Sequence, residues 1–223
     1  MMLPRIAEPS QVCVGASQDH VDYVLPFAYS ARYQRLSGIK VAVSVGPPQM
    51  TIPAAARGKL DFVITDTDGV SDGRLEHELL YAGQVSVVAA PGHSLAARGE
   101  LTLADLVGYE WVIPTGAMEQ QLRDTFVARG LPPPVVKLLA SSACLRAGAL
   151  AKSRLLGVHA APTVLMRTEA RSQLAMLPVK DFRWRCRVYA AYRSLAALSA
   201  AARGLLAHLK AIEITPAEHE EVV

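Results

Sequence analysis

Residues 39–65, IKVAVSVGPPQMTIPAAARGKLDFVIT, decide the fold class of this chain. The stretch opens at 39–45 with a continuous run of β-branched and apolar residues, which is typical of a buried strand in a parallel sheet. A Gly-Pro-Pro turn ends that strand, and a short helix is predicted over 50–57, stopped by Gly58. A second buried strand follows at 60–65. Strand, helix and strand in this order predict a parallel sheet with right-handed crossovers.

The same alternation extends in both directions along the chain. A strand at 11–16 leads into a helix whose apolar residues run at helical spacing from Val21 to Ala28. Further strands are predicted at 75–81, 84–90, 111–113, 135–139, 156–159, 173–177 and 186–191. Further helices are predicted at 103–106, 119–128, 144–150, after Pro162 and, as one apolar stripe, from Leu195 to Ile212. The sequence therefore predicts an α/β protein.

Composition excludes several classes of protein. Of 223 residues, 51% are hydrophobic and 19% charged, so the chain is not disordered, and a net charge of +3 is too small for a nucleic-acid surface. No apolar leader and no membrane-length apolar stretch, which takes about 18 residues, is present. The odd number of cysteines (Cys13, Cys144 and Cys186) argues against disulfides, and together these features favour a cytoplasmic protein.

Motifs for catalysis are absent from the sequence. No nucleophile elbow, phosphate-binding loop or dinucleotide fingerprint occurs, and no histidine pair has metal-ligand spacing. The acidic turn starting at Asp66 fails as a calcium loop, because its sixth position is Ser71 and its twelfth is His77. We therefore expect no catalytic residue, no metal and no cofactor.

Polar residues remain at the ends of the predicted strands. In open parallel sheets the carboxyl ends of strands converge on one crevice, where helix N-termini offer free N–H donors. Any one of these residues could simply be a helix cap or a loop residue. As a group, however, they are expected at one edge of the sheet because of its topology. The candidate ligand-binding residues are Ser17, Gln18, Asp19, Gln49, Thr65, Thr115, Gly116, Ser141 and His159.

Five short patterns, in this order and spacing, resemble the effector-binding region of LysR-type transcriptional regulators over roughly residues 11–212. They are Val14-Gly15-Ala16 with Leu25-Pro26, 56–64 (ARGKLDFVI), 87–96 (VVAAPGHSLA), 101–106 (LTLADL) and 109–113 (YEWVI).

That resemblance implies a fold like the type II periplasmic binding proteins, with two Rossmann-like lobes joined by two crossing strands. Lobe I would hold residues 11–90 and 187–212, and lobe II residues 91–186. The family places a winged helix-turn-helix ahead of this region, whereas about ten residues precede the first strand here. We therefore expect that DNA is contacted only through a head domain missing from this chain.

The resemblance also implies what the domain binds. A small-molecule effector would lie in the cleft between the lobes and control DNA binding and transcription by the full-length protein. Residues 109–114 with Ser141-Ser142 are similar to the branch that senses sugars or aromatic acids, so an aromatic or sugar acid is expected. Asp19 would compete with such an acid, unless an arginine or His159 compensates.

Self-association is a further implication of the family. Two such domains would pair as an antiparallel dimer, lobe I against lobe II, with the first helix and its Tyr29 and Tyr33 at the contact. Two other functions stay open. A periplasmic-type solute-binding protein of a transport system shares the architecture, and so do some enzymes. A helix-turn-helix in the upstream coding sequence would favour the regulator.

Overall fold

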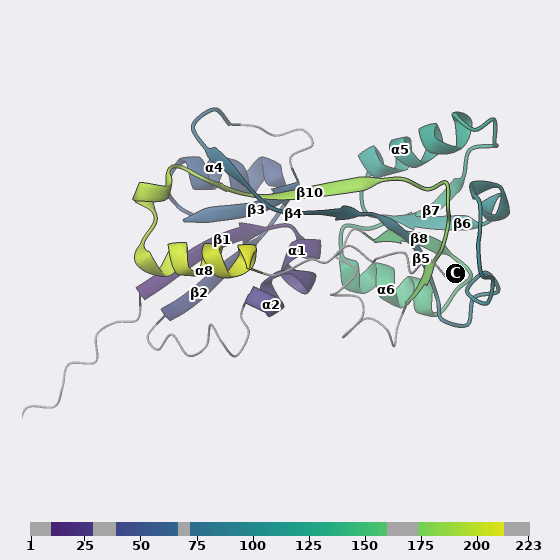
Figure 1. Ribbon diagram of the computed structural model, residues 1–223, viewed down its shortest axis with the longest axis horizontal. Coiled ribbons are helices and arrows are strands. Elements are labelled where there is room, and N and C mark those ends of the chain that lie inside the picture. Colours follow the sequence, from purple (N-terminus) through teal and green to yellow (C-terminus); the bar gives the residue numbers. More distant parts are fainter. Residues whose placement is uncertain (1–9, 29–38, 67–71, 160–173, 212–223) are drawn as a thin grey trace, which may run out of the picture. The chain divides into compact units, whose positions relative to one another are not determined.

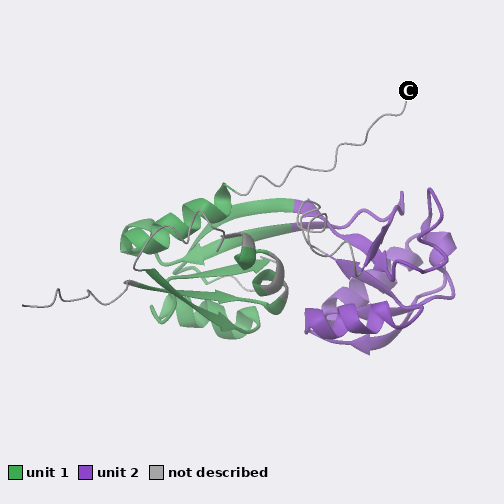
Figure 2. Ribbon diagram, turned by 90° about the horizontal axis from the view of Figure 1, so that it is seen from below, with its two compact units in different colours: residues 1–82, 187–213 green, residues 83–186, 214–223 purple. Residues whose placement is uncertain are grey.

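A computed structural model describes residues 10–28, 39–66, 72–159 and 174–211 of the chain. The chain divides into two compact units, residues 1–82 with 187–213 and residues 83–186 with 214–223 (Figure 2). Unit 1 is therefore assembled from two stretches of sequence that are separated by residues 83–186 of unit 2. The expected helix after Pro162 and the expected dimer residues Tyr29 and Tyr33 lie outside the described residues.

Unit 1 is built on a five-stranded sheet in the order β2-β1-β3-β10-β4. Its strands are β1 (Ser10–Ala16), β2 (Ile39–Val45), β3 (Phe62–Asp66), β4 (Glu76–Gln84) and β10 (Arg185–Tyr192). β1 pairs in parallel with both β2 and β3, as the alternating sequence pattern predicts, whereas β10 runs antiparallel to β3. The sheet is therefore mixed, because β10 belongs to a stretch of chain that returns from the other unit.

Helices cover both faces of this sheet (Figure 1). Unit 1 contains α1 (Gln18–Tyr23), α2 (Leu25–Ala28), α4 (Pro48–Ala56), the 3₁₀ turn η3 (Leu195–Ala197) and α8 (Ala200–Lys210). On one face, Ile52 and Ala55 of α4 pack with Val63 of β3. On the other face α8 packs against β1 and buries Leu205 and Leu209. Successive residues of the central strands thus point to opposite faces of the sheet and pack against different helices.

Three sequence expectations for unit 1 need correction. The first helix divides at Val24, because Pro26 has no N–H to continue the hydrogen-bond ladder. The strand at 39–45 is parallel but only partly buried, since β2 is an edge strand with a single neighbour. The last helix begins at Ala200 with Ser199 as its N-cap and not at Leu195, which is exposed in η3.

Unit 2 carries a second five-stranded sheet, in the order β7-β6-β8-β5-β9. The strands β6, β7 and β8 are parallel to one another, and β5 runs antiparallel to β8 and β9. The bounds are β5 (Ser86–Ala89), β6 (Glu110–Ile113), β7 (Val135–Leu139), β8 (Leu156–His159) and β9 (Ala175–Leu177), with η1 (Leu103–Leu106), α5 (Gly116–Val127) and α6 (Ala143–Ala151).

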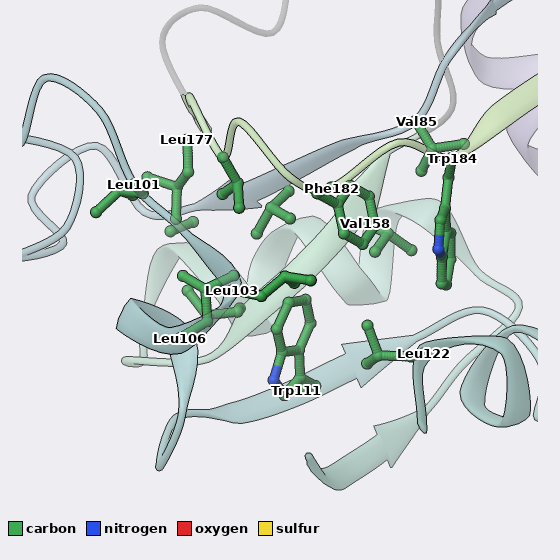
Figure 3. Close-up of a cluster of buried hydrophobic side chains, with 14 of the residues drawn as sticks. Val85, Leu101, Leu103, Leu106, Trp111, Leu122, Val158, Leu177, Phe182 and Trp184 are labelled. Atoms are coloured by element: carbon green, nitrogen blue, oxygen red, sulfur yellow. The ribbon is translucent and has the colours of Figure 1, made fainter. Parts of the chain in front are cut away.

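The main core of unit 2 lies on the α5 face of this sheet (Figure 3). Trp111 and Ile113 of β6 point to this face and meet Leu122 and Phe126 of α5. Val112, between the two β6 residues, packs with Leu150 of α6 on the opposite face. Because successive residues of β6 point to opposite faces of the sheet, β6 is buried on both sides. The helices α5 and α6 lie on these opposite faces (Figure 1).

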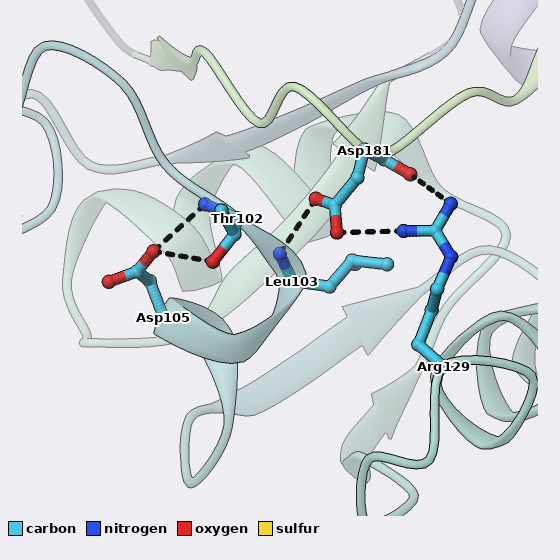
Figure 4. Close-up of polar contacts among 5 residues, drawn as sticks. All are labelled: Thr102, Leu103, Asp105, Arg129 and Asp181. Atoms are coloured by element: carbon cyan, nitrogen blue, oxygen red, sulfur yellow. Dashed lines mark hydrogen bonds and ion pairs between the residues drawn. The ribbon is translucent and has the colours of Figure 1, made fainter.

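Polar contacts hold the segment before β6 in place (Figure 4). Thr102 and Asp105 form a reciprocal capping box at the start of η1. Asp181 accepts a hydrogen bond of 2.8 Å from the backbone N–H of Leu103 and one of 2.7 Å from Arg129. One carboxylate therefore joins η1 to the end of α5.

The chain passes from one unit to the other within β4 and returns within β10. The first crossing falls at residues 82–83, whereas the sequence analysis assigned residues up to 90 to lobe I. The difference has a plain cause: β5 pairs with β8 and β9, so it belongs to the second sheet. The return crossing falls at 186–187.

Candidate functional site

The carboxyl end of β1 leads directly into the first group of candidate residues. Ser17 is the N-cap residue of α1, yet its hydroxyl makes no cap hydrogen bond. Gln18 and Asp19 follow as the first two residues of the helix. The side chain of Asp19 lies outside the described part of the structure. Ser17 is thus a half-buried residue directly after β1, and its hydroxyl does not cap α1.

The carboxyl end of β3 lies beside that of β1, because Ala16 is opposite Ile64 in their parallel pairing. Thr65 lies inside β3, is 2% exposed, and donates its hydroxyl to the carbonyl of Asp66 at 3.1 Å. The exposed carboxylate of Asp66 pairs with Nε2 of the buried His20 from α1. His20 was not predicted from the sequence, since a single histidine in a helix carries no local sign of a partner 46 residues away.

The loop after β2 completes the edge of the unit 1 sheet. The N–H of Gly46 donates to the carbonyl of Ala16 at 3.0 Å, which holds this loop against the end of β1. Gln49 is exposed in the first turn of α4. Thr51, two residues further along α4, is buried, and its hydroxyl donates to the carbonyl of Pro47. Gln49 is therefore the solvent-facing polar group of this loop.

Unit 2 repeats this arrangement with two longer helices. Ile113 lies opposite Leu139 in the parallel pairing of β6 and β7, so Thr115 and Ser141 leave the sheet at the same edge. Thr115 is the exposed N-cap of α5 and accepts a hydrogen bond of 3.3 Å from Met118 N–H, and the exposed Gly116 begins the helix. Two helices therefore begin at the same edge of the sheet, each directly after one of two neighbouring parallel strands.

The start of α6 is capped by the residue after the one that sequence analysis chose. Ser141 is exposed in the turn, whereas Ser142 is the N-cap and accepts a 3.2 Å hydrogen bond from Leu145 N–H. Both hydroxyls lie in the β7–α6 turn. The cap role of Ser142 leaves the hydroxyl of Ser141 as the more exposed of the two.

Two buried ionisable groups lie beneath this edge. Arg146 of α6 is 6% exposed, and its Nη1 donates to the carbonyls of Ala140 and Ser141 at 2.8 and 2.9 Å. His159 ends β8 and is 7% exposed. Burial, and secondarily the charge of Arg146, lower the pKa of His159 to about 4, so its ring is neutral near pH 7. His159 was among the residues predicted from the sequence, whereas Arg146 was not.

The carboxyl edges of both sheets carry groups that can bind a ligand by hydrogen bonds. They offer hydroxyls, an amide, helix N-terminal N–H groups and, in unit 2, a buried guanidinium. Among the described residues, no cluster of three or more His, Cys, Asp and Glu could hold a metal ion. The described helices are also too short or too polar for any of them to cross a membrane.

Comparison with known proteins fits this geometry. Residues 7–212 match the family described as LysR substrate binding domain. This chain belongs to that family. The match spans nearly the whole chain, so the family resemblance found in the sequence and the two-lobed α/β fold are both confirmed.

Solved structures similar to this LysR substrate binding domain share its fold at low sequence identity. The regulatory domain of CcmR from Synechocystis PCC6803, in complex with 2-PG, has a TM-score of 0.73 at 19% identity and covers 93% of this chain and 100% of its own. HinK from Pseudomonas aeruginosa, a LysR family transcriptional regulator, has a TM-score of 0.74 at 16% identity over 93% of this chain and 71% of its own. The BenM effector binding domain with benzoate has a TM-score of 0.68 at 18% identity over 90% of each chain.

Proposed function

We propose that this chain senses a small-molecule effector as the ligand-binding part of a LysR-type transcriptional regulator. The ligand would control DNA binding and transcription by the full-length, cytoplasmic protein. Membership of the LysR substrate binding domain family supports this function. The CcmR and BenM domains, whose structures hold 2-PG and benzoate, add support by analogy. Catalysis is no part of the proposal, because the matched family is regulatory.

One observation carries the proposal furthest: in both sheets, polar residues and helix starts follow directly on the carboxyl ends of parallel strands. This is where open α/β sheets bind their ligands. All nine residues predicted from the sequence remain candidate ligand contacts. The candidates in each unit are tested by substitutions in that unit. Ser17 in unit 1 and Thr115 in unit 2 are the first to test.

A dimer is part of the proposed function. Support comes from one edge strand of each sheet, β2 and β7, which carry exposed apolar side chains. These are Val43 and Val45 on β2, and Val135 and Leu139 on β7. An exposed apolar edge strand is a surface that proteins usually cover. The proposed arrangement pairs lobe I of one copy with lobe II of the other.

Calorimetric titration of the purified chain tests effector binding. The panel contains 2-PG, benzoate, shikimate and neutral sugars. We expect at least one acid to bind the wild type. Ser17→Ala and Thr115→Ala should each weaken that binding about 2- to 10-fold, the loss of one net hydrogen bond of about 0.5–1.5 kcal/mol.

The matched control is Ser94→Ala, which removes an exposed hydroxyl of unit 2 that contacts the hydroxyl of Tyr109, the residue before β6, at the opposite end of that strand from Thr115. Its affinity should equal that of the wild type. Circular dichroism of each variant checks that Thr115→Ala still folds, because that change also removes the α5 cap. A ligand whose affinity is unchanged by both Ser17→Ala and Thr115→Ala would contradict the proposed site.

A further inference from the structure

Four positively charged residues lie at the amino edge of the unit 1 sheet, where its parallel strands begin. Lys40 is the second residue of β2, Arg57 and Lys59 lie between α4 and β3, and Arg193 directly follows β10. Because β10 runs antiparallel to β3, the end of β10 lies at the same edge as the start of β3. All four residues are exposed, and we call them the amino-edge cluster.

The guanidinium of Arg193 brings three of the four charges together. A Cβ added to Gly58 would lie 3.0 Å from Cζ of Arg193 and 3.1 Å from each of its Nη atoms. Gly58 is the residue between Arg57 and Lys59. The side chain of Arg193 therefore lies directly over the turn that carries the other two cations.

Lys40 lies on the same face of the sheet as α4. Two residues further along β2, Ala42 lies opposite Cys13, which packs with the α4 residues, and strand residues two apart point to the same side. From β2 to β10 the sheet has three strand spacings, about 14 Å at about 4.8 Å each. One strand of duplex DNA carries a phosphate every 3.4 Å of helix axis, so this width spans about four phosphates.

The surrounding sequence supplies few carboxylates to this edge. Residues 39–60 and 182–212, which hold all four cations, contain no Asp or Glu. The first carboxylate after the turn is Asp61, and its Oδ2 accepts a hydrogen bond of 2.7 Å from the backbone N–H of Cys13. That carboxylate is thus already bonded to the end of a neighbouring strand.

The carboxylates near β4 also have other partners or face away. Asp72 pairs with Arg74. Glu78 pairs with Lys210 of α8, and Glu76, two residues earlier in β4, points to that same α8 face. Within the part of the chain that the structure describes, no member of the amino-edge cluster forms an ion pair. The cluster is therefore a local excess of positive charge.

Unit 2 contains a pair of cations in the matching position. Lys152 and Arg154 are exposed and lie between α6 and β8, as Arg57 and Lys59 lie between α4 and β3. Other cations of unit 2 are paired with carboxylates. These are Arg98, Arg129, Lys137 and Lys180. Lys152 and Arg154 thus provide a control with the same charges, spacing and exposure.

We infer that the amino-edge cluster binds the phosphate backbone of duplex DNA without reading its sequence. Lysine and arginine neutralise DNA phosphates, and such contacts carry no sequence information. The choice of DNA over an acidic protein surface rests on the proposed function, since a transcriptional regulator acts on DNA. This contact is additional to the one expected through a separate head domain. The net charge of the chain did not indicate it, because the four cations are scattered between residues 40 and 193.

Fluorescence anisotropy with two labelled duplexes of about 20 base pairs and unrelated sequence tests the inference on the wild-type chain. Both should bind with equal affinity. Neutralisation of four phosphates predicts a slope of about −3.6 for the logarithm of the binding constant against that of salt, which is a loss of about 100-fold between about 50 and 200 mM. Absence of binding at about 50 mM salt, a slope near zero, or preference for one sequence would overturn the inference.

Two double variants locate the contact. Arg57→Gln with Lys59→Gln should reduce the magnitude of the salt slope by about 2 and weaken binding at least about 10-fold at about 50 mM salt. Lys152→Gln with Arg154→Gln removes the same two charges from unit 2 and should leave slope and affinity unchanged. A folded Arg57→Gln, Lys59→Gln variant that keeps the wild-type slope would overturn the assignment to this edge.

A measurement on the wild type decides the case in which that variant does not fold. Unlabelled duplex is titrated into ¹⁵N-labelled chain at low salt and the amide signals are followed by NMR. The signals of Gly58 and Arg193 should shift, and those of Lys152 and Arg154 should not. Shifts that spare Gly58 and Arg193 would place the contact elsewhere and overturn the inference.

Poly-L-glutamate separates DNA from an acidic protein as the partner. It should bind more weakly than the duplex, because an extended peptide carries one charge per about 3.3 Å and duplex DNA one per about 1.7 Å. Equal affinity would overturn the assignment to DNA. Loss of the DNA contact leaves effector sensing intact, whereas failure of every compound in the calorimetric panel to bind contradicts effector sensing and leaves the measured DNA contact standing.

Discussion

The two tryptophans of the chain, both in unit 2, differ in whether the indole N–H is bonded. Trp184 donates to the hydroxyl of Thr125 at 2.9 Å and stacks on Phe182. Trp111 is fully buried edge-on to Phe126, and its N–H meets no acceptor within the described residues. A buried donor without a partner costs about 1–3 kcal/mol. Trp111 therefore contributes packing at the expense of an unmet hydrogen bond.

This contrast predicts opposite consequences for two identical substitutions. Trp111→Phe loses some packing but removes the unmet donor, so the free energy of unfolding should stay within about 1 kcal/mol of the wild type. Trp184→Phe loses packing and a bond, and should cost about 1–2 kcal/mol more than Trp111→Phe. Urea unfolding followed by far-UV circular dichroism measures both, since each variant removes one of the only two tryptophans and so changes the fluorescence signal. A larger loss for Trp111→Phe would refute this reading.

Residue-level chemistry was only partly predictable from the sequence. Ser17, Thr115 and Ser141 were found because strand ends can be read from the apolar pattern, and their neighbours follow. Arg146 and His20 were not found, because burial and long-range partners leave no periodic signal. An arginine three residues into a short helix reads as a solvent-facing charge until its contacts with Ala140 and Ser141 are known.

At the scale of elements, the order of strands and helices was predictable, but the position of each strand in its sheet was not. β2 has the β-branched sequence of a central strand yet lies at an edge. β5 follows β4 closely in sequence yet belongs to the other sheet. Strand composition reports local preference, whereas sheet order depends on which strands arrive from distant parts of the chain.

The exposed apolar face of β2 predicts the outcome of a single charge substitution. Val45→Lys places an ammonium on the edge strand and should convert the dimer to a monomer, with little loss of stability because Val45 is 52% exposed. Val127→Lys is the matched control, since Val127 is 59% exposed on α5, and should leave the dimer intact. Sedimentation velocity over a range of concentrations measures both. A monomeric wild type, or a dimeric Val45→Lys, would contradict the proposed contact.

At the scale of the whole molecule, a discontinuous unit 1 follows from the chain path. β10 and α8 return after the main stretch of unit 2 and complete the first sheet and one of its helical layers. Lys210 of α8 pairs with Glu78 of β4, and the hydroxyl of Tyr192 donates to the same carboxylate at 3.0 Å. The contact with Lys210, and secondarily that with Tyr192, lowers the pKa of Glu78. Burial, together with the hydrogen bond to Glu78, raises the pKa of Tyr192 to about 12. The last helix, α8, is thus an integral part of the fold of unit 1.

The central claim is that this LysR substrate binding domain binds its effector at the carboxyl ends of the parallel strands. A crystal structure of the chain with the tightest-binding acid of the calorimetric panel tests it most directly. The account predicts that the acid lies at the starts of α5 and α6, within hydrogen-bond distance of Thr115 or Ser141. Electron density for the acid at the amino ends of these strands, or on the outer face of a helix, would contradict it.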